Sequence, residues 1–112
     1  MAKLGILTLK GVSGKKYQFN VYDAKVDWKE DIACVYYVSK REVDSDETGS
    51  HTAIYIGETG DLKTRHENHH RQQCFERRGY NCISVHREPD QTTRLAIEAD
   101  LIKAYDPPCN RE

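Results

Sequence analysis

The sequence predicts an α+β fold of the α/β sandwich type: a small central antiparallel sheet flanked by helices, with an added N-terminal β-hairpin. Five runs rich in β-branched and aromatic residues are separated by turn or loop residues, which is typical of strands. Two later stretches are helical in character, and each follows an aspartate suited to capping a helix. At 112 residues the chain is one compact domain, in which we distinguish a hairpin extension with its linker (1–30) from a main unit (31–112).

The first two strands are expected to form a β-hairpin. They cover residues 4–9 and 17–22, and the glycine-containing residues 11–14 between them supply the turn. Alternate residues of a strand point to opposite faces of a sheet, so one side of the second strand is expected to be buried. That side consists of Tyr17, Phe19 and Val21.

The third and fourth strands are expected to form a second hairpin with a long loop. Residues 23–31 are mostly polar and are interpreted as a connection anchored by Trp28. The third strand covers residues 33–40, and the fourth covers residues 51–57. The acidic residues 41–50 between them have nothing to bury, which favours a loop.

Two helices and a fifth strand complete the pattern. Asp61 is a suitable N-cap for a helix from Leu62 to about Phe75, and the strand follows at residues 80–86. Asp90 is a suitable N-cap for the second helix, at residues 91–105. Two prolines then end that helix, because proline cannot continue the backbone hydrogen bonding.

The composition describes a soluble globular protein with a small core. Apolar residues make up 38% of the chain and charged residues 31%, and the mean hydropathy is −0.81. No apolar run reaches the ~18–20 residues that cross a bilayer, and no signal peptide is recognisable, so a cytoplasmic location is expected. The net charge of −1 argues against simple electrostatic binding of nucleic acid, although residues 1–30 carry six lysines against three acids.

The four cysteines show no CxxC spacing and are interpreted as reduced thiols. Cys34 and Cys82 lie within apolar strand-like runs, so both are expected to be small core residues.

The second helix carries a carboxylate on its expected buried side. Its apolar stripe is formed by Leu95, Ala99, Ile102, Leu101 and Tyr105. At about 100° per residue, Glu98 falls within this stripe. A carboxylate there loses hydration unless a cation or a hydrogen-bond donor compensates. Glu98 therefore indicates either an internal salt bridge to an arginine or a metal-binding or catalytic role.

The first helix presents a comparable polar face. Leu62, Arg65, His66 and His69 share one side. Arg65 and His69 lie one turn apart and suit recognition of a phosphate, because arginine donates a planar fork of hydrogen bonds. The alternative is a solvated polar face. A zinc site seeded by His66, His70 and Cys74 with Cys82 or His86 is less favoured, since the paired spacing of zinc fingers is absent.

These residues resemble the motifs of the GIY-YIG nucleases over about residues 33–110. Cys34-Val35-Tyr36 resembles the first motif with cysteine in place of glycine, and Tyr55-Ile56-Gly57 matches the second without change. The family's arginine, histidine, glutamate and late asparagine fall on Arg65, His69, Glu98 and Asn110.

The resemblance implies hydrolysis of phosphodiester bonds with one divalent metal ion, Mg²⁺ or Mn²⁺. Glu98 would hold the metal, and Arg65 would neutralise charge on the phosphoryl oxygens. Tyr55 would act as the base, with Tyr36 positioning it, or the two tyrosines would exchange these roles. His69 would contact phosphate or relay a proton. Further contacts to nucleic acid are expected from Lys63, His66, Arg71 and Asn110.

Two functions of different classes follow. The first is an endonuclease acting on DNA, or less favourably on RNA, and it could work as a homodimer. The second is a nucleic-acid-binding or interaction module on the same fold with weak or no cleavage. Glu58 favours the second, because it stands where some members carry a lysine near the attacked phosphate.

Overall fold

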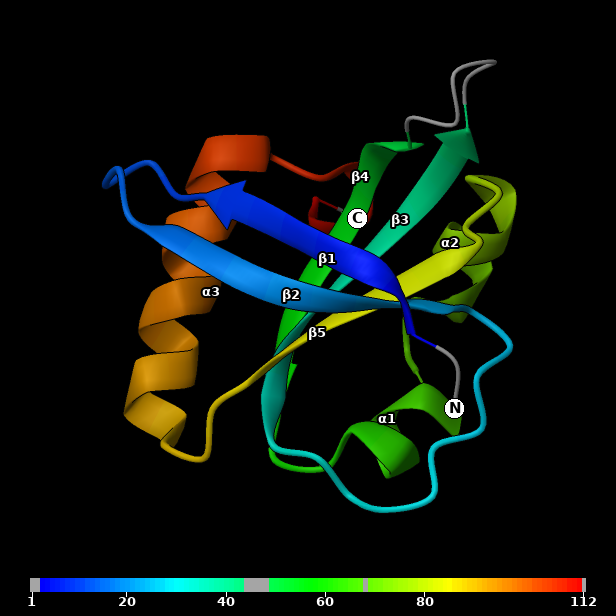
Figure 1. Cartoon of the computed structure of the whole chain (residues 1–112), viewed down its shortest axis with the longest axis horizontal. Coiled ribbons are helices and arrows are strands. Elements are labelled where there is room, and N and C mark those ends of the chain that lie inside the picture. The colour runs from blue at the N-terminus through cyan, green and yellow to red at the C-terminus, as the bar shows by residue number, and fades with distance from the viewer. Residues whose placement is uncertain (1–2, 44–48, 68, 112) are drawn as a thin grey trace.

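The computed structural model describes residues 3–43, 49–67 and 69–111, without the side chains of residues 66 and 67. This part of the chain contains five strands, three α-helices and one 3₁₀ helix (Figure 1). The strands are β1 (Lys3–Lys10), β2 (Lys16–Asp23), β3 (Cys34–Val43), β4 (Gly49–Thr59) and β5 (Cys82–Arg87). The helices are α1 (Leu62–Glu67), α2 (Gln72–Arg77), α3 (Gln91–Tyr105) and the 3₁₀ helix η1 (Pro108–Asn110).

The described strands form one antiparallel sheet in the order β1-β2-β5-β3-β4. The N-terminal hairpin joins this sheet because β2 pairs with β5. In the β3–β4 pair, Tyr36 lies beside Gly57 and Val38 lies beside Tyr55. The two motif tyrosines therefore come from neighbouring strands, displaced by two residues along the sheet.

The predicted α/β sandwich is wrong. Strands account for 43% of the structure and helices for 28%, and the five strands curl into a half-barrel accompanied by three short helices. Every strand twists in the same sense, and this twist accumulates over a sheet of five strands. The sequence pattern located the strands, but it carries no direct measure of how far the sheet coils, so a flatter central layer was expected.

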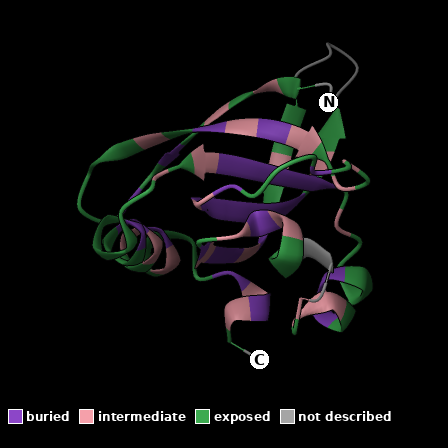
Figure 2. Ribbon diagram, turned by 90° about the horizontal axis from the view of Figure 1, so that it is seen from below, coloured by how far each residue is buried: buried purple, intermediate pink, exposed green. Residues whose placement is uncertain are grey.

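The strands carry most of the buried residues (Figure 2), and these residues form two clusters, one on each face of the sheet. On one face the cluster includes Tyr36, Val38, Ile83 and Val85 from the strands, with Leu62 from α1, Phe75 from α2 and Trp28. On the other face it includes Leu9, Phe19, Val35 and Tyr37, with Ile97 and Leu101 from α3. Side chains of a strand point alternately to opposite faces of the sheet, so neighbouring residues of β3 enter different clusters.

The five strands predicted from the sequence are confirmed, with small shifts at their ends. The predicted β-hairpin is β1–β2, and Phe19 and Val21 are buried as expected. Trp28 is buried and confirms the predicted anchor. The predicted loop at residues 41–50 is shorter at both ends, because β3 continues to Val43 and β4 begins at Gly49; residues 44–48 lie outside the described residues.

The single helix predicted at residues 62–75 is wrong, because α1 ends at Glu67 and α2 begins at Gln72. The Arg71 backbone N–H donates to the His69 ring Nδ1 at 3.0 Å. A side chain that binds nearby backbone in this way competes with helical hydrogen bonding. The short connection turns the chain, so that α1 and α2 form two separate segments over the sheet (Figure 1).

The second predicted helix is confirmed as α3, including its cap, since the Asp90 carboxylate accepts the Thr93 N–H at 2.9 Å. Its predicted apolar stripe is partly wrong: Leu101 is buried as expected, but Leu95, Ala99 and Tyr105 are exposed. Leu95 is 47% exposed, whereas the buried residues of α3 are Arg94, Ile97 and Leu101. The helix is rotated toward a stripe that includes an arginine, because Arg94 finds an acidic partner in the sheet.

The interpretation of all four cysteines as reduced thiols is wrong for Cys74 and Cys109, which form a disulfide between α2 and η1. They are 35 residues apart, so no local spacing in the sequence predicts that they form a disulfide. Cys34 and Cys82 are free and buried, as expected of core residues. Among the described residues, no helix combines the length and the apolar character needed to pass through a bilayer.

Candidate active site

The two motif tyrosines lie together because the residue between them in space is a glycine. The ring centroids of Tyr36 and Tyr55 are 6.0 Å apart. A Cβ atom added at Gly57 would lie 2.5 Å from the Tyr36 hydroxyl and 2.8 Å from the Tyr55 ring. Real Cβ contacts are essentially never this short. The second motif therefore needs glycine at this position so that both phenols can occupy the same corner of the sheet.

His69 is bonded directly to one of these phenols. Its Nε2 lies 2.6 Å from the Tyr36 hydroxyl oxygen. Its Nδ1 accepts the backbone N–H of Arg71 and so carries no proton in that arrangement. The neutral ring then has its proton on Nε2 and donates it to the Tyr36 oxygen. Tyr36 must direct its own O–H elsewhere.

A second interaction links Tyr36 to the neighbouring phenol, Tyr55. The hydrogen bond between the phenols raises the pKa of Tyr36 and lowers the pKa of Tyr55. Burial is nonetheless the largest effect on both groups and raises each pKa above its ordinary value. His69, Tyr36 and Tyr55 thus form a connected polar chain at this corner of the sheet.

Two arginines flank the phenols. The Arg65 guanidinium lowers the pKa of both tyrosines, and Arg71 lowers that of Tyr55. Within the described part of the chain, Arg65 has no acidic partner, and the Arg71 Nε is buried without a hydrogen-bond partner. Arg65, which is exposed, therefore keeps donors for an anionic ligand, whereas the Arg71 Nε is closed off from solvent. Lys63 lies half-buried on α1, two residues before Arg65.

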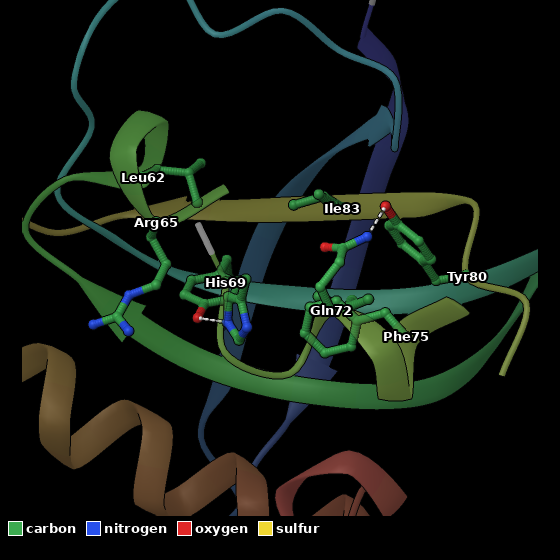
Figure 3. A pocket seen from close by; sticks show the side chains of 9 residues that line it. Leu62, Arg65, His69, Gln72, Phe75, Tyr80 and Ile83 are labelled. Atoms are coloured by element: carbon green, nitrogen blue, oxygen red, sulfur yellow. Dashed lines mark hydrogen bonds between the residues drawn. The ribbon is translucent and has the colours of Figure 1, made fainter. Parts of the chain in front are cut away.

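Arg65 stands between an enclosed cavity and an open hollow. The cavity holds about 10 Å³ and is lined by Tyr36, Val38, Leu62, Arg65, His69, Gln72, Phe75, Tyr80 and Ile83 (Figure 3). It has room for about one water molecule. The hollow, about 250 Å³, is lined by Thr59, Asp61, Thr64 and Arg65. Only the hollow has the size for a phosphate group, so a substrate would approach Arg65 from that side.

Glu98 lies on α3. Its side chain is half-buried, and its charge raises the pKa of Tyr55. Burial and the nearby Glu58 charge raise the pKa of Glu98, while a hydrogen bond from the Glu58 backbone N–H lowers it. The salt bridge to an arginine that was one expectation for Glu98 is made by Glu58 instead. The Glu58 Oε2 lies 2.9 Å from the Arg94 Nε.

The carboxylate of Glu98 is a suitable ligand for a magnesium or manganese ion. A carboxylate has several lone-pair sites, and one backbone N–H leaves others free. Mg²⁺ prefers hard oxygen ligands and often takes one or two carboxylates, with water and substrate phosphate completing its shell. In the described residues no group of three histidine, cysteine or acidic side chains is placed to hold a metal ion. Glu98 would thus hold the ion with substrate oxygens.

Asn110 touches the sheet rather than open solvent. Its amide donates to the Ile56 carbonyl at 2.8 Å and accepts the Ile56 N–H at 2.9 Å. This pairing occupies the outer edge of β4 next to Tyr55. The expected contact of Asn110 with nucleic acid stays a prediction, while a role in fixing β4 is directly visible.

The histidine and cysteine cluster on the first helix is altered by the fold. Cys74 is committed to a disulfide and offers no thiolate, so the zinc set predicted with it is wrong. His70 is exposed and stacks on His69 with ring centroids 4.8 Å apart. The side chain of His66 lies outside the described residues.

Sequence reasoning missed two features around the site. One is the buried Arg94–Glu58 ion pair, and a charged residue inside the Ile97–Leu101 stripe was the available signal. The other is the disulfide between α2 and η1, for which the sequence offers no spacing signal. In comparisons with known proteins, no family model, no curated protein and no solved structure matches the chain. The GIY-YIG resemblance therefore depends on the residues and their geometry alone.

Proposed function

We propose that the protein is a metal-dependent endonuclease of the GIY-YIG type, which hydrolyses phosphodiester bonds in DNA. One observation carries the proposal. Side chains from β3, β4 and α1, together with His69, meet at one corner of the sheet although they are distant in sequence. Two phenols, a guanidinium without an acidic partner among the described residues, and the half-buried Glu98 carboxylate, whose charge acts on Tyr55, supply the groups that phosphodiester hydrolysis needs.

The hydrogen bond between His69 and Tyr36 supports Tyr55 as the base. His69 donates to the Tyr36 oxygen, so Tyr55 is the phenol that we expect to accept a proton from the attacking water. Tyr36 then stabilises the charge that develops on Tyr55 by its hydrogen bond. The raised pKa of Tyr55 makes this step demanding, and the positive charges of Arg65 and Arg71 reduce that demand. The reverse assignment, with Tyr36 as the base, would require the hydrogen bond between His69 and Tyr36 to reverse its direction.

Arg65 binds the scissile phosphate from the open hollow. Its planar guanidinium can donate two hydrogen bonds to the phosphoryl oxygens as their charge grows. A divalent ion at Glu98 would polarise a phosphate oxygen and stabilise the leaving oxygen. Lys63 and Arg71 lie on either side of this position in the sequence and extend the positive surface for the strand.

A binding module with weak or no cleavage is the second candidate. The observation in its favour is that burial raises the pKa of both phenols, so neither ionises readily near neutral pH. The net charge of −1 also predicts weak general attraction to nucleic acid. This candidate retains binding at Arg65 and Arg71 without turnover.

Cleavage assays separate the two candidates. Supercoiled, branched and single-stranded DNA, with RNA for comparison, are incubated with the protein and Mg²⁺ or Mn²⁺. We expect cleavage by the wild type and its loss in Glu98→Gln and Arg65→Ala. Asp27→Asn and Arg78→Ala are exposed control variants that should cleave normally. Binding without cleavage of any substrate would favour the second candidate, and cleavage that survives Glu98→Gln would refute the metal assignment.

Two further expectations stay proposals. A homodimer is proposed because one set of catalytic groups hydrolyses one strand, so cutting a duplex needs two; light scattering with and without DNA tests it. A cytoplasmic location is proposed from the sequence, but the disulfide argues for a less reducing setting. Alkylation and mass spectrometry of Cys74 and Cys109 in protein trapped from cells decide that question.

A further inference from the structure

Tyr55 is supported by two segments that follow it at a distance in the chain. Its ring centroid lies 5.4 Å from that of Phe75 in α2. Its backbone neighbour Ile56 makes two hydrogen bonds with the side chain of Asn110 in η1, at 2.8 and 2.9 Å. The Tyr55 ring therefore packs against α2, while the strand that carries it is held at its outer edge by η1.

A disulfide joins these two supporting segments directly. Cys74 of α2 is bonded to Cys109 of η1. Cys74 immediately precedes Phe75, and Cys109 immediately precedes Asn110. Both cysteines and Phe75 are buried, with at most 4% of each residue exposed. The contacts therefore form a closed loop, which runs from the Tyr55 ring through α2, the disulfide and η1 back to β4.

Phe75 also supports the histidine of the candidate site. Its ring centroid lies 4.7 Å from that of His69, and the His69 ring meets the Tyr55 ring edge-on at 5.1 Å. Both Phe75 and His69 line the enclosed cavity (Figure 3). A shift of α2 would therefore disturb the packing of Tyr55 and of the histidine that is bonded to Tyr36.

Both segments are too short to be held in place by helical structure alone. α2 has six residues and η1 has three. Isolated helices shorter than about 12–15 residues are marginal in water, because few hydrogen bonds offset the cost of ordering the chain. The covalent link between the two segments limits how far they can move apart. The disulfide therefore restrains the one part of the support around Tyr55 that its own secondary structure leaves weak.

We propose that the Cys74–Cys109 disulfide and Phe75 form a brace that positions the Tyr55 ring for proton transfer. The inference rests on the proposed function, in which Tyr55 is the base. The disulfide and Phe75 are buried and act through Tyr55, so they are positioning groups. A displacement of about 1 Å among reacting groups can lower a rate about 100-fold. The brace therefore contributes to the rate of cleavage in addition to the stability of the fold.

A disulfide that only stabilises the folded state is the alternative, and three variants distinguish the two. Cys74→Ala/Cys109→Ala breaks the covalent link. Phe75→Leu removes the aromatic ring and keeps an apolar side chain. Cys82→Ala is the matched control, because it removes a buried sulfur that is not part of a disulfide. Each protein is measured at a temperature at which its circular dichroism is that of the fully folded state.

The experiment measures two quantities on folded protein. The first is the single-turnover rate of cleavage at saturating DNA and Mn²⁺. The second is the nuclear Overhauser effect between the ring protons of Tyr55 and His69, which reports their geometry without substrate or metal. We expect the double cysteine variant and Phe75→Leu to cleave about 10–100-fold more slowly and to lose most of this effect. Cys82→Ala should keep the wild-type rate and the wild-type effect.

A wild-type rate and a wild-type Overhauser effect in the double cysteine variant, with only its urea midpoint lowered, would overturn the brace. If that variant fails to fold, Cys74→Ala/Cys109→Val restores part of the lost volume and decides by the same two measurements. If wild-type protein cleaves no DNA, the proposed function fails. The Overhauser effect between Tyr55 and His69 then decides the positioning role separately.

Discussion

Gly57→Ala should separate the two phenols with the smallest possible change in the chain. The new Cβ would stand 2.5 Å from the Tyr36 hydroxyl, whereas carbon and its neighbours prefer about 3.5–4.0 Å. The Tyr36 ring is 3% exposed and packs in the core, so it cannot simply swing into solvent. Relief therefore requires a shift of about 1 Å in a ring or in β4. Overpacking of this kind costs about 1–3 kcal/mol of unfolding free energy.

The catalytic consequence should exceed the loss of stability. A displacement of about 1 Å among reacting groups can lower a rate about 100-fold. Urea unfolding gives the change in stability, and single-turnover cleavage of DNA in Mn²⁺ gives the rate. Gly5→Ala is the matched control, because a Cβ at Gly5 meets no atom within 4 Å. Wild-type stability and wild-type cleavage in Gly57→Ala would refute the assigned crowding around the two tyrosines.

Three other predictions follow from the packing of the fold. Cys74→Ala/Cys109→Ala should lower the unfolding free energy by about 3–4 kcal/mol, because the disulfide closes a loop of 35 residues in the unfolded chain; equal urea midpoints with and without it would contradict this. Burial raises the pKa of Tyr37 to about 12, so the folded state keeps its phenol protonated longer than the unfolded state, and stability should fall as pH rises from about 10 to 12. Tyr37→Phe should reduce this loss of unfolding free energy by roughly 2–3 kcal/mol, measured by urea titrations at the two pH values. An equal loss in the variant and the wild type would disprove the prediction. Asn110→Ala should cost about 1–3 kcal/mol and slow cleavage, because Ile56 loses two hydrogen bonds beside Tyr55; thermal unfolding and a rate at saturating Mn²⁺ that match wild type would count against this.

Local patterns in the sequence located most elements. Strands were recognisable because β-branched and aromatic residues alternate around turns, as in the hairpin that buries Phe19 and Val21. The cap at Asp90 was recognisable because its bond to Thr93 is local. Features decided within a few residues could therefore be predicted.

Features decided by distant contacts could not. The stripe of α3 was misjudged at Leu95 because the helix turns Arg94 inward to meet Glu58, and that partner comes from β4. The disulfide was missed because α2 and η1 meet only after the sheet has formed. The coiling of the sheet likewise depends on all five strands together.

The candidate site lies between these two cases. The spacing of Arg65 and His69 was readable along the chain, although their helix breaks between them and His69 reaches Tyr36 from a connection. Glu98 was singled out from an apolar stripe that is partly wrong, yet its side chain is half-buried and its charge raises the pKa of Tyr55. The influence of Glu58 on the pKa of Glu98 could be found only from the fold.

Cleavage by Tyr55→Phe tests the central claim most directly, because this variant removes one oxygen and keeps the ring that packs against His69 and Phe75. The measurement is the single-turnover rate on end-labelled DNA in Mn²⁺. Tyr80→Phe, which removes a phenol oxygen from the nearby cavity, is the control. General-base catalysis contributes about 100–10,000-fold, so we predict a loss of that order in a variant that still folds cooperatively. A rate equal to wild type in Tyr55→Phe would contradict the account.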